Sequence, residues 1–165
     1  MPSNDYHFIT TWRVKGTIEE IFDIIGSPLE LARWWPSVYL EVQELEPGDP
    51  VTHVGRVIDL YTKGWLPYTL RWQFRVTEVD RPHRMALDPR GDFLGYGVWT
   101  FHQEGEWARV VYEWKVAAQK PLLRNLSFLF KPIFSANHRW AMRMGEESLK
   151  LELARRHAAT DEERA

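Results

Sequence analysis

Histidine, tyrosine, asparagine and arginine are the side chains of this sequence whose types and spacing could support chemistry. The six histidines are scattered along the chain, and no two of them have the spacing of a metal-binding motif. There is no cysteine, which excludes disulfides, thiol catalysis and thiolate metal ligands. No serine lies in a Gly-x-Ser-x-Gly motif. The sequence therefore predicts no metal site, no cofactor and no nucleophile.

Four polar residues remain as candidates for contact with a ligand. Tyr112 lies on the apolar face of a predicted strand and Asn137 on the inward face of a predicted helix, where each could orient the polar end of a ligand. Arg139 and Arg143 are four residues apart on one helix edge, which suits the binding of an anion. Each also has an ordinary interpretation: a core aromatic for Tyr112, a helix-start residue for Asn137, and a solvated edge for the arginines.

The elements that would position these residues are strands in which wide apolar side chains alternate with polar ones. A period of two places the apolar residues on one face of a sheet. The alternating apolar residues are Trp72, Phe74, Val76, Trp99, Phe101, Tyr112, Trp114 and Val116. One helix cannot cover a long twisted sheet along its whole length. We therefore expect an apolar hollow beside the aromatic face, which is the usual setting of a small-molecule site.

Two short helices are predicted after the first strand. Thr17 and Glu20 have the spacing of a capping box, and Gly26 ends the helix that they begin. Ser27 and Glu30 have the same spacing and predict a second box-capped helix, which ends at the Trp-Trp-Pro sequence of residues 34–36.

Seven strands are predicted, at residues 6–14, 38–43, 52–62, 68–79, 84–87, 93–103 and 108–118. Their short connections favour an antiparallel meander. Gly95 and Gly97 lie inside one strand and predict a bulge or a sharp bend.

A long helix is predicted from about residue 136 to 156, and it would be about 30 Å long. Pro132 should break or kink any helix around it. The expected inward face consists of Asn137, Trp140, Ala141, Met144, Ser148 and Leu151. Residues 6–156 would form a single domain, with residues 1–5 and 157–165 as flexible termini.

Composition and charge limit the partners of the chain. The 165 residues suit one domain, and no apolar run is long enough to span a membrane, so we expect a soluble cytoplasmic protein. The predicted aromatic face points away from the strand arginines and the net charge is −2, so we expect no nucleic-acid partner. Residues 114–145 contain no acidic residue. The apolar and basic segment from Leu122 to Phe134 could therefore touch a membrane surface transiently, the alternative being ordinary packing before the helix.

Six short segments resemble those of a known superfamily. They are residues 17–23 (TIEEIFD), 32–36 (ARWWP), 74–82 (FRVTEVDRP), 97–101 (GVWTF), 111–116 (VYEWKV) and 137–145 (NHRWAMRMG). The chain resembles the START-like, or SRPBCC, superfamily over about residues 6–153, and in particular its polyketide cyclase/dehydrase and lipid-transport branch. The resemblance implies the α+β helix-grip fold, in which a curved seven-stranded antiparallel sheet grips a long C-terminal helix with a cavity between them.

The leading hypothesis for function is the binding of a small hydrophobic ligand, such as a lipid or polyketide, for transport or sequestration. The residues expected to line the cavity are Trp72, Phe74, Trp99, Phe101, Tyr112, Trp114, Asn137, Ala141 and Met144. A second hypothesis is a polyketide cyclase/dehydratase, in which Tyr112 or a histidine supplies acid/base help. A third is a protein-interaction or co-chaperone module. The sequence leaves open whether the protein is a monomer or a homodimer.

Overall fold

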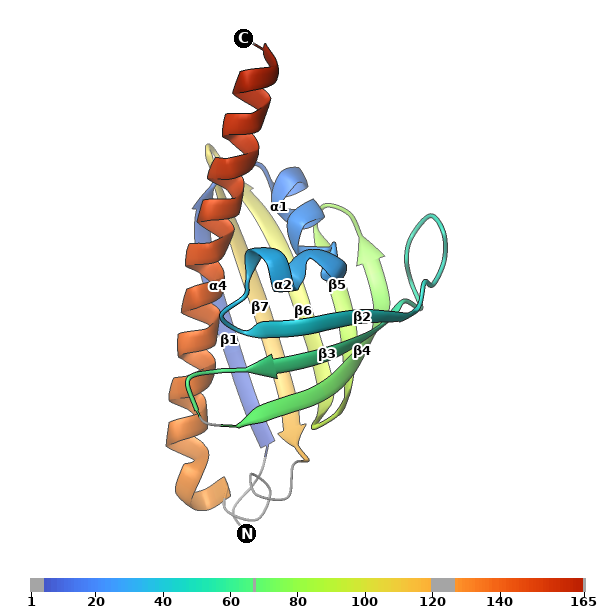
Figure 1. Cartoon of the computed structure of the whole chain (residues 1–165), viewed down its shortest axis with the longest axis vertical. Coiled ribbons are helices and arrows are strands. Elements are labelled where there is room, and N and C mark those ends of the chain that lie inside the picture. The colour runs from blue at the N-terminus through green and yellow to red at the C-terminus, as the bar shows by residue number, and fades with distance from the viewer. Residues whose placement is uncertain (1–4, 67, 120–126, 165) are drawn as a thin grey trace.

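The computed structural model describes residues 5–66, 68–119 and 127–164, with the backbone alone for residues 127–130 and 164. It has an α+β architecture of one seven-stranded antiparallel sheet, two short helices after the first strand, and a long C-terminal helix (Figure 1). The strands are β1 Asp5–Lys15, β2 Tyr39–Glu46, β3 Val57–Lys63, β4 Thr69–Asp80, β5 Arg84–Gly91, β6 Phe93–Glu104 and β7 Trp107–Ala118. Their spatial order, β1-β7-β6-β5-β4-β3-β2, is a meander in which β1 pairs with the last strand.

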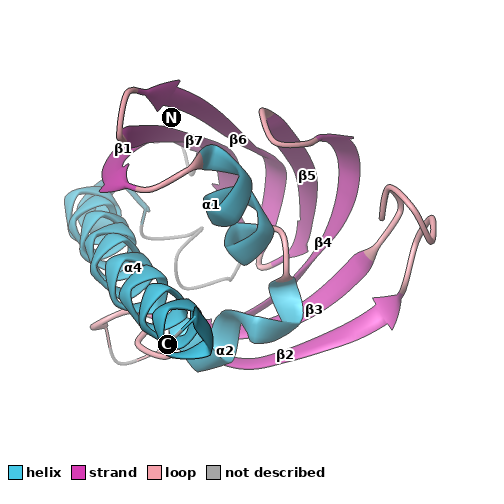
Figure 2. Cartoon of the chain, turned by 90° about the horizontal axis from the view of Figure 1, so that it is seen from above, coloured by secondary structure: helices cyan, strands magenta, loops and turns pink. Residues whose placement is uncertain are grey.

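The sheet is strongly curved and closes around the long helix α4, Ser127–Arg164. Figure 2 shows the sheet as a wall that is open on the side where α4 lies, with α1 and α2 near that opening. The predicted alternation is confirmed, because the inward side chains of β4, β6 and β7 are buried and their neighbours are more exposed. The inward aromatic rings of these strands belong to the buried core, together with aliphatic side chains of α1, β3 and α4.

Helix α1, Ile18–Ile25, begins at the predicted capping box. The Thr17 hydroxyl accepts a hydrogen bond from the Glu20 backbone N–H (3.2 Å), and the Glu20 carboxylate accepts one from the Thr17 N–H (2.8 Å). The second predicted box does not form. The Ser27 hydroxyl instead donates to the Asp23 carbonyl oxygen (2.7 Å), and a 3-10 turn, Pro28–Glu30, leads into α2, Leu31–Trp34. A local bond to the preceding helix therefore replaces the cap.

The strand predictions need three corrections. β3 begins at Val57 rather than at residue 52, because the Asp49 carboxylate accepts hydrogen bonds from the N–H groups of Val51 and Thr52 and folds that segment into a loop. β5 extends to Gly91 rather than ending at residue 87. Its pairing with β6 ends at the Leu87–Gly97 pair, so the rest of β5 pairs with β4 alone. A strand with one unpaired edge tolerates a proline. Of the bulge or bend predicted at Gly95 and Gly97, the bulge does not form, because the register between β6 and β7 is continuous; β6 separates from β5 on the N-terminal side of Gly97.

Helix α4 is longer than predicted and differs in register. It contains Pro132 and continues to Arg164, beyond the predicted end. Leu151, predicted to face inward, is 73% exposed. Among the described side chains of α4, which are those of residues 131–163, the buried residues are Met142, Gly145, Leu149, Glu152 and Leu153. Apolar residues occur on several sides of this helix, so periodicity alone did not fix which side would be buried.

No helix among the described residues is long and apolar enough to cross a membrane. Most of the segment proposed to touch a membrane, Leu122 to Phe134, lies outside the residues whose side chains the structure describes. Its role therefore stays a prediction.

Candidate functional site

The aromatic face of the sheet and helix α4 border a hollow of about 130 Å³, called here the first chamber. A second chamber of about 80 Å³ lies beneath α1 and α2. Trp35, Tyr39, Trp72 and Tyr112 line both chambers. These four residues therefore lie between the two chambers.

The structure places seven of the nine predicted residues at the chambers. Those at one or both chambers are Trp72, Phe74, Trp99, Tyr112, Trp114, Asn137 and Ala141. Phe101 lines neither, because its ring packs against Phe22 of α1 with 5.1 Å between the ring centroids. Met144 lines neither, because the register of α4 turns Ala141 and Met142 toward the hollow instead. Whether the seven residues contact a ligand stays a prediction.

Several residues of the first chamber were not among the predicted site residues. Those with an aromatic or imidazole ring include Tyr6, Phe8, Trp35, Tyr39, Tyr68, Phe134 and His138. Tyr6 and Phe8 lie on the inward face that alternation predicts for the first strand, so that pattern could have identified them. No local pattern identifies Trp35 or His138, because their positions depend on how α2 and α4 pack on the sheet.

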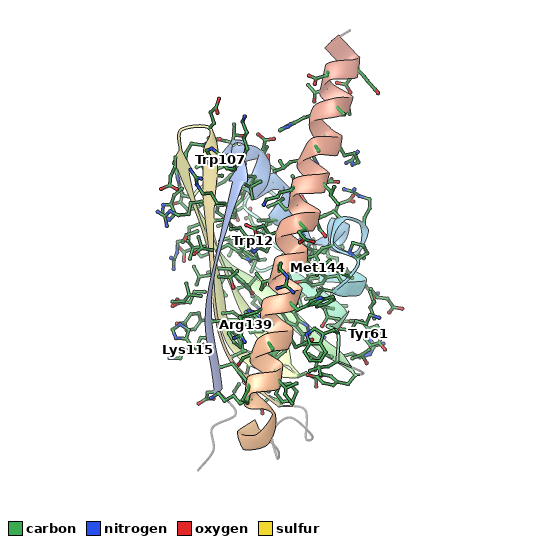
Figure 3. The ribbon with its side chains drawn as sticks, turned by 90° about the vertical axis from the view of Figure 1, so that its left-hand side faces the viewer. Trp12, Tyr61, Trp107, Lys115, Arg139 and Met144 are labelled. Carbon is green, nitrogen blue, oxygen red and sulfur yellow. The ribbon has the colours of Figure 1, made fainter. Side chains whose placement is uncertain are left out.

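Arg139 and Arg143, the proposed anion clamp, are both exposed and do not line either chamber. Figure 3 views the molecule from the α4 side and shows Arg139 and Met144 on this helix. The arginines therefore cannot meet a ligand inside the hollow as the helix is placed. Among the described residues, no three His, Asp or Glu side chains form a group that could hold a metal ion.

Four tyrosines line the first chamber, and all of them are uncharged at neutral pH. Burial raises the pKa of Tyr39 and, together with the nearby Tyr39 phenol, raises that of Tyr112. Burial likewise raises the pKa of Tyr6, and burial together with Tyr6 raises that of Tyr68. The chamber therefore presents hydroxyl groups that can donate or accept a hydrogen bond without carrying charge.

Tyr112 is held rigidly by its neighbours. Its ring stacks on Trp99, with centroids 4.0 Å apart and planes 15° apart, and on Trp114 at 5.6 Å and 27°. Its hydroxyl lies beside Gly97, where a Cβ atom would approach it to 2.9 Å. Glycine at this position of β6 thus leaves room for the phenol, and any larger residue would displace Tyr112 or Trp114.

His138 is the most unusual polar group of the chamber. Its imidazole stacks on Phe8 of β1, with centroids 4.1 Å apart and planes 15° apart. Its Nε2 atom is buried and has no hydrogen-bond partner among the described residues. Burial, with a smaller effect of the Arg139 charge, lowers the pKa of His138 to about 4. The ring is therefore neutral at pH 7.

His138 should make stability depend on pH in a defined window. The unfolded chain binds a proton at His138 below about pH 6.5, whereas the folded chain does so only near pH 4. The free energy of unfolding should therefore fall as the pH is lowered from 6.5 to 4, with a slope approaching about 1.4 kcal/mol per pH unit. Urea unfolding at half-unit pH steps measures this slope.

The matched variant is His138→Phe, which should lose most of this slope. Glu20, Asp23, Asp49 and Glu152, whose pKa values the fold lowers, affect stability mainly below about pH 4.5, so the slopes of wild type and variant are compared between pH 6.5 and 5. An unchanged slope in the variant would contradict the assignment of the effect to His138.

Asn137 joins α4 to the connection between β3 and β4. Its Oδ1 accepts a hydrogen bond from the Trp65 backbone N–H (2.9 Å). The carboxamide lies directly against Gly64, at a position that a Cβ atom on residue 64 would overlap. In this structure Asn137 therefore acts as a link between two elements, although it also lines the first chamber.

Gly64→Ala should break this link and lower the free energy of unfolding by about 1–2 kcal/mol, because the new methyl group displaces the carboxamide. Asn137→Ala removes the group that clashes. The double variant should therefore be more stable than the sum of the single effects implies, and urea unfolding of all four proteins measures this coupling. Additive effects would show that Gly64 and Asn137 act independently.

Comparison with known proteins supports the fold. Neither a protein-family model nor a curated protein sequence matches this chain. The Zhui aromatase/cyclase from Streptomyces sp. R1128 matches with a TM-score of 0.71 at 16% identity, over 92% of this chain and 95% of the other. A START superfamily protein from Mycobacterium smegmatis matches with a TM-score of 0.66 at 12% identity, over 90% of this chain and 97% of the other.

The di-domain ARO/CYC BexL from the BE-7585A biosynthetic pathway also matches, with a TM-score of 0.63 at 16% identity. The match covers 90% of this chain and 51% of that two-domain protein. At such identities the likeness establishes the fold alone. The helix-grip architecture that the sequence resemblance implied is confirmed.

Proposed function

We propose that this helix-grip protein binds a small, mainly hydrophobic ligand in the two chambers between its sheet and α4. The observation that carries the proposal is a hollow walled by aromatic rings, several of whose residues carry a buried polar atom with no hydrogen-bond partner among the described residues. Tyr6 Oη, Trp35 Nε1 and His138 Nε2 are such atoms, and their residues all line the first chamber.

The energetics favour an occupied chamber. An apolar cavity of about 150 Å³ in another protein accepts benzene, so the first chamber, at about 130 Å³, has the size for one small ring. A buried polar group without a hydrogen bond costs about 1–3 kcal/mol. A ligand that fills the chamber and bonds even one of these atoms would recover part of that cost while burying its own apolar surface.

Native mass spectrometry of the purified full-length chain tests the proposal. We expect an additional mass that dissociates at moderate collision energy and disappears after extraction with organic solvent. The extracted chain should then bind small aromatic probes such as toluene, with shifts of amide signals in 15N–1H NMR spectra confined to the chamber residues. No additional mass, combined with no probe binding at millimolar concentration, would contradict it.

A second candidate function is aromatic cyclisation or dehydration of a polyketide in the same chambers. It is favoured by the neutral imidazole of His138 and the protonated phenol of Tyr112, which line one chamber and could accept and donate a proton. Two of the compared structures are described as an aromatase/cyclase and an ARO/CYC, which supports the same proposal. The interaction-module hypothesis gains no specific observation and stays a prediction.

Tyr112→Phe separates binding from catalysis. If Tyr112 transfers a proton, the variant should lose about 10²-fold or more in turnover of a poly-β-ketone substrate, while its affinity for the cyclised product changes by less than about threefold. Turnover and product affinity are measured on the same preparation. Equal rates with and without the wild-type protein, over a panel of such substrates, would rule out the enzyme.

A further inference from the structure

Two of the buried polar atoms without a hydrogen-bond partner among the described residues belong to neighbouring residues of the first chamber, Tyr6 and His138. The Tyr6 ring stacks on Phe8, with centroids 5.9 Å apart and planes 19° apart, and Phe8 in turn stacks on His138. The three rings form a continuous stack that joins β1 to α4. Tyr6 and His138, which carry these two atoms, therefore belong to one aromatic wall with the ring of Phe8 between theirs.

We propose that Tyr6 and His138 form a polar anchor that binds an uncharged oxygen of the ligand, a hydroxyl or a carbonyl, and that this anchor disfavours a carboxylate of the same shape. The proposal rests on the proposed ligand-binding function and specifies the chemical class of the ligand. It assigns these two residues a role in specificity that shape and apolar contact alone do not provide.

Hydrogen-bonding capacity supports an oxygen that is neutral. A tyrosine hydroxyl both donates and accepts, and Nε2 of a neutral imidazole does one or the other according to its tautomer. A ligand hydroxyl satisfies either tautomer, and a ligand carbonyl satisfies the tautomer that donates. An apolar ligand of equal size would leave both protein atoms unsatisfied.

The charges around the anchor disfavour a buried carboxylate. Among the described residues that line the first chamber, Lys63 alone carries a formal charge at neutral pH, and it is exposed. Lys131 lies over the Tyr6 ring, with Nζ 5.3 Å from its centroid, and Arg139 follows His138 on the exposed side of α4. Among the described residues no cation lines the buried part of the chamber, so a carboxylate there would lose its hydration without a direct ionic partner from them.

Three probes of similar size test the anchor: phenol, toluene and benzoate. Their dissociation constants are measured at pH 7 by NMR titration of the solvent-extracted full-length chain. Water solvates phenol more strongly than toluene, so neither affinity is informative alone. The informative quantity is the ratio of the phenol affinity to the toluene affinity, and this ratio is compared between wild type and variant. His138→Phe and Tyr6→Phe should each shift this ratio against phenol by about 3- to 10-fold, which is the range expected for one hydrogen bond.

The matched control is His102→Phe, because His102 is an exposed histidine of β6 that lines neither chamber. It should leave the ratio unchanged within twofold. Imidazole 15N spectra of the wild-type chain give a second readout that does not require a variant to fold. Phenol should move the Nε2 resonance of His138, assigned through bonds from its own backbone amide, whereas toluene should move it much less.

The outcomes distinguish the two proposals. Binding of toluene and phenol with a ratio that neither variant changes would overturn the anchor and leave the ligand-binding function standing. Tighter binding of benzoate than of phenol would overturn the selection against charge. Failure of all three probes to bind, with no co-purified ligand, would overturn the proposed function itself.

Discussion

Replacing Ala141 with phenylalanine should weaken binding of toluene or a co-purified ligand by about 100-fold or more. Ala141 lies on the inward side of α4 and lines the first chamber. A cavity of about 150 Å³ holds one benzene, so the phenyl ring of the variant would itself occupy most of the first chamber. A 100-fold loss corresponds to about 2.7 kcal/mol of binding free energy. Native mass spectrometry and NMR titration measure the effect.

The control for this substitution is Ala158→Phe, which adds the same ring to an exposed position of the same helix. Its ligand affinity should stay within twofold of wild type. Urea unfolding of both variants verifies that the fold is retained. Affinity retained within threefold in Ala141→Phe would show that the ligand, if one binds, lies elsewhere.

Glu152→Gln should lower the free energy of unfolding by about 2 kcal/mol, the largest effect on stability that we expect from a substitution that removes a charge. The Glu152 carboxylate is buried on α4 and accepts hydrogen bonds from Arg33 of α2 (2.7 and 3.0 Å), Arg155 (both 3.0 Å) and Arg156 (2.9 Å). These arginines, Arg33 first, hold the pKa of Glu152 well below its usual range.

The size of this effect follows from the exposure of the partners. Removing one member of a fully buried ion pair costs about 3–5 kcal/mol, but the three arginines are 38–58% exposed and water screens them. The amide of glutamine accepts fewer hydrogen bonds and leaves three cations close together. Urea unfolding at pH 7 in low and high salt measures the loss, which salt should reduce.

Glu147→Gln provides the control, because Glu147 is exposed on the same helix and has no ion pair recorded with the described residues. It should change the free energy of unfolding by less than about 0.5 kcal/mol. Equal effects of the two substitutions would mean that the arginine cluster does not hold α2 against α4.

Period-two alternation and turn residues sufficed to predict the meander, its inward aromatic face and the capping box of α1, because these features depend on neighbours within a few positions. The same reasoning from neighbouring residues failed at Ser27. Its hydroxyl donates a hydrogen bond to the Asp23 carbonyl oxygen instead of capping the next helix, and both partners are similarly near in the sequence. That reasoning failed again at β3, where a single carboxylate folds the chain into a loop.

The register of α4 was decided by tertiary contact. Several sides of this helix carry apolar residues, and the packing of Trp35 against Gly145, at a position that a Cβ atom would overlap, determines which side faces inward. That choice brings Ala141 and His138 to the chamber and leaves Met144 away from it.

The amino-acid sequence by itself thus determined that one face of a curved sheet is aromatic and must be covered, because the direction of each strand side chain follows from its position in the chain. Only the tertiary structure decided which atoms border the space that remains. The stacking of His138 on Phe8 and the isolation of its Nε2 depend on how a helix packs against a strand more than a hundred residues earlier, and no local pattern encodes that contact.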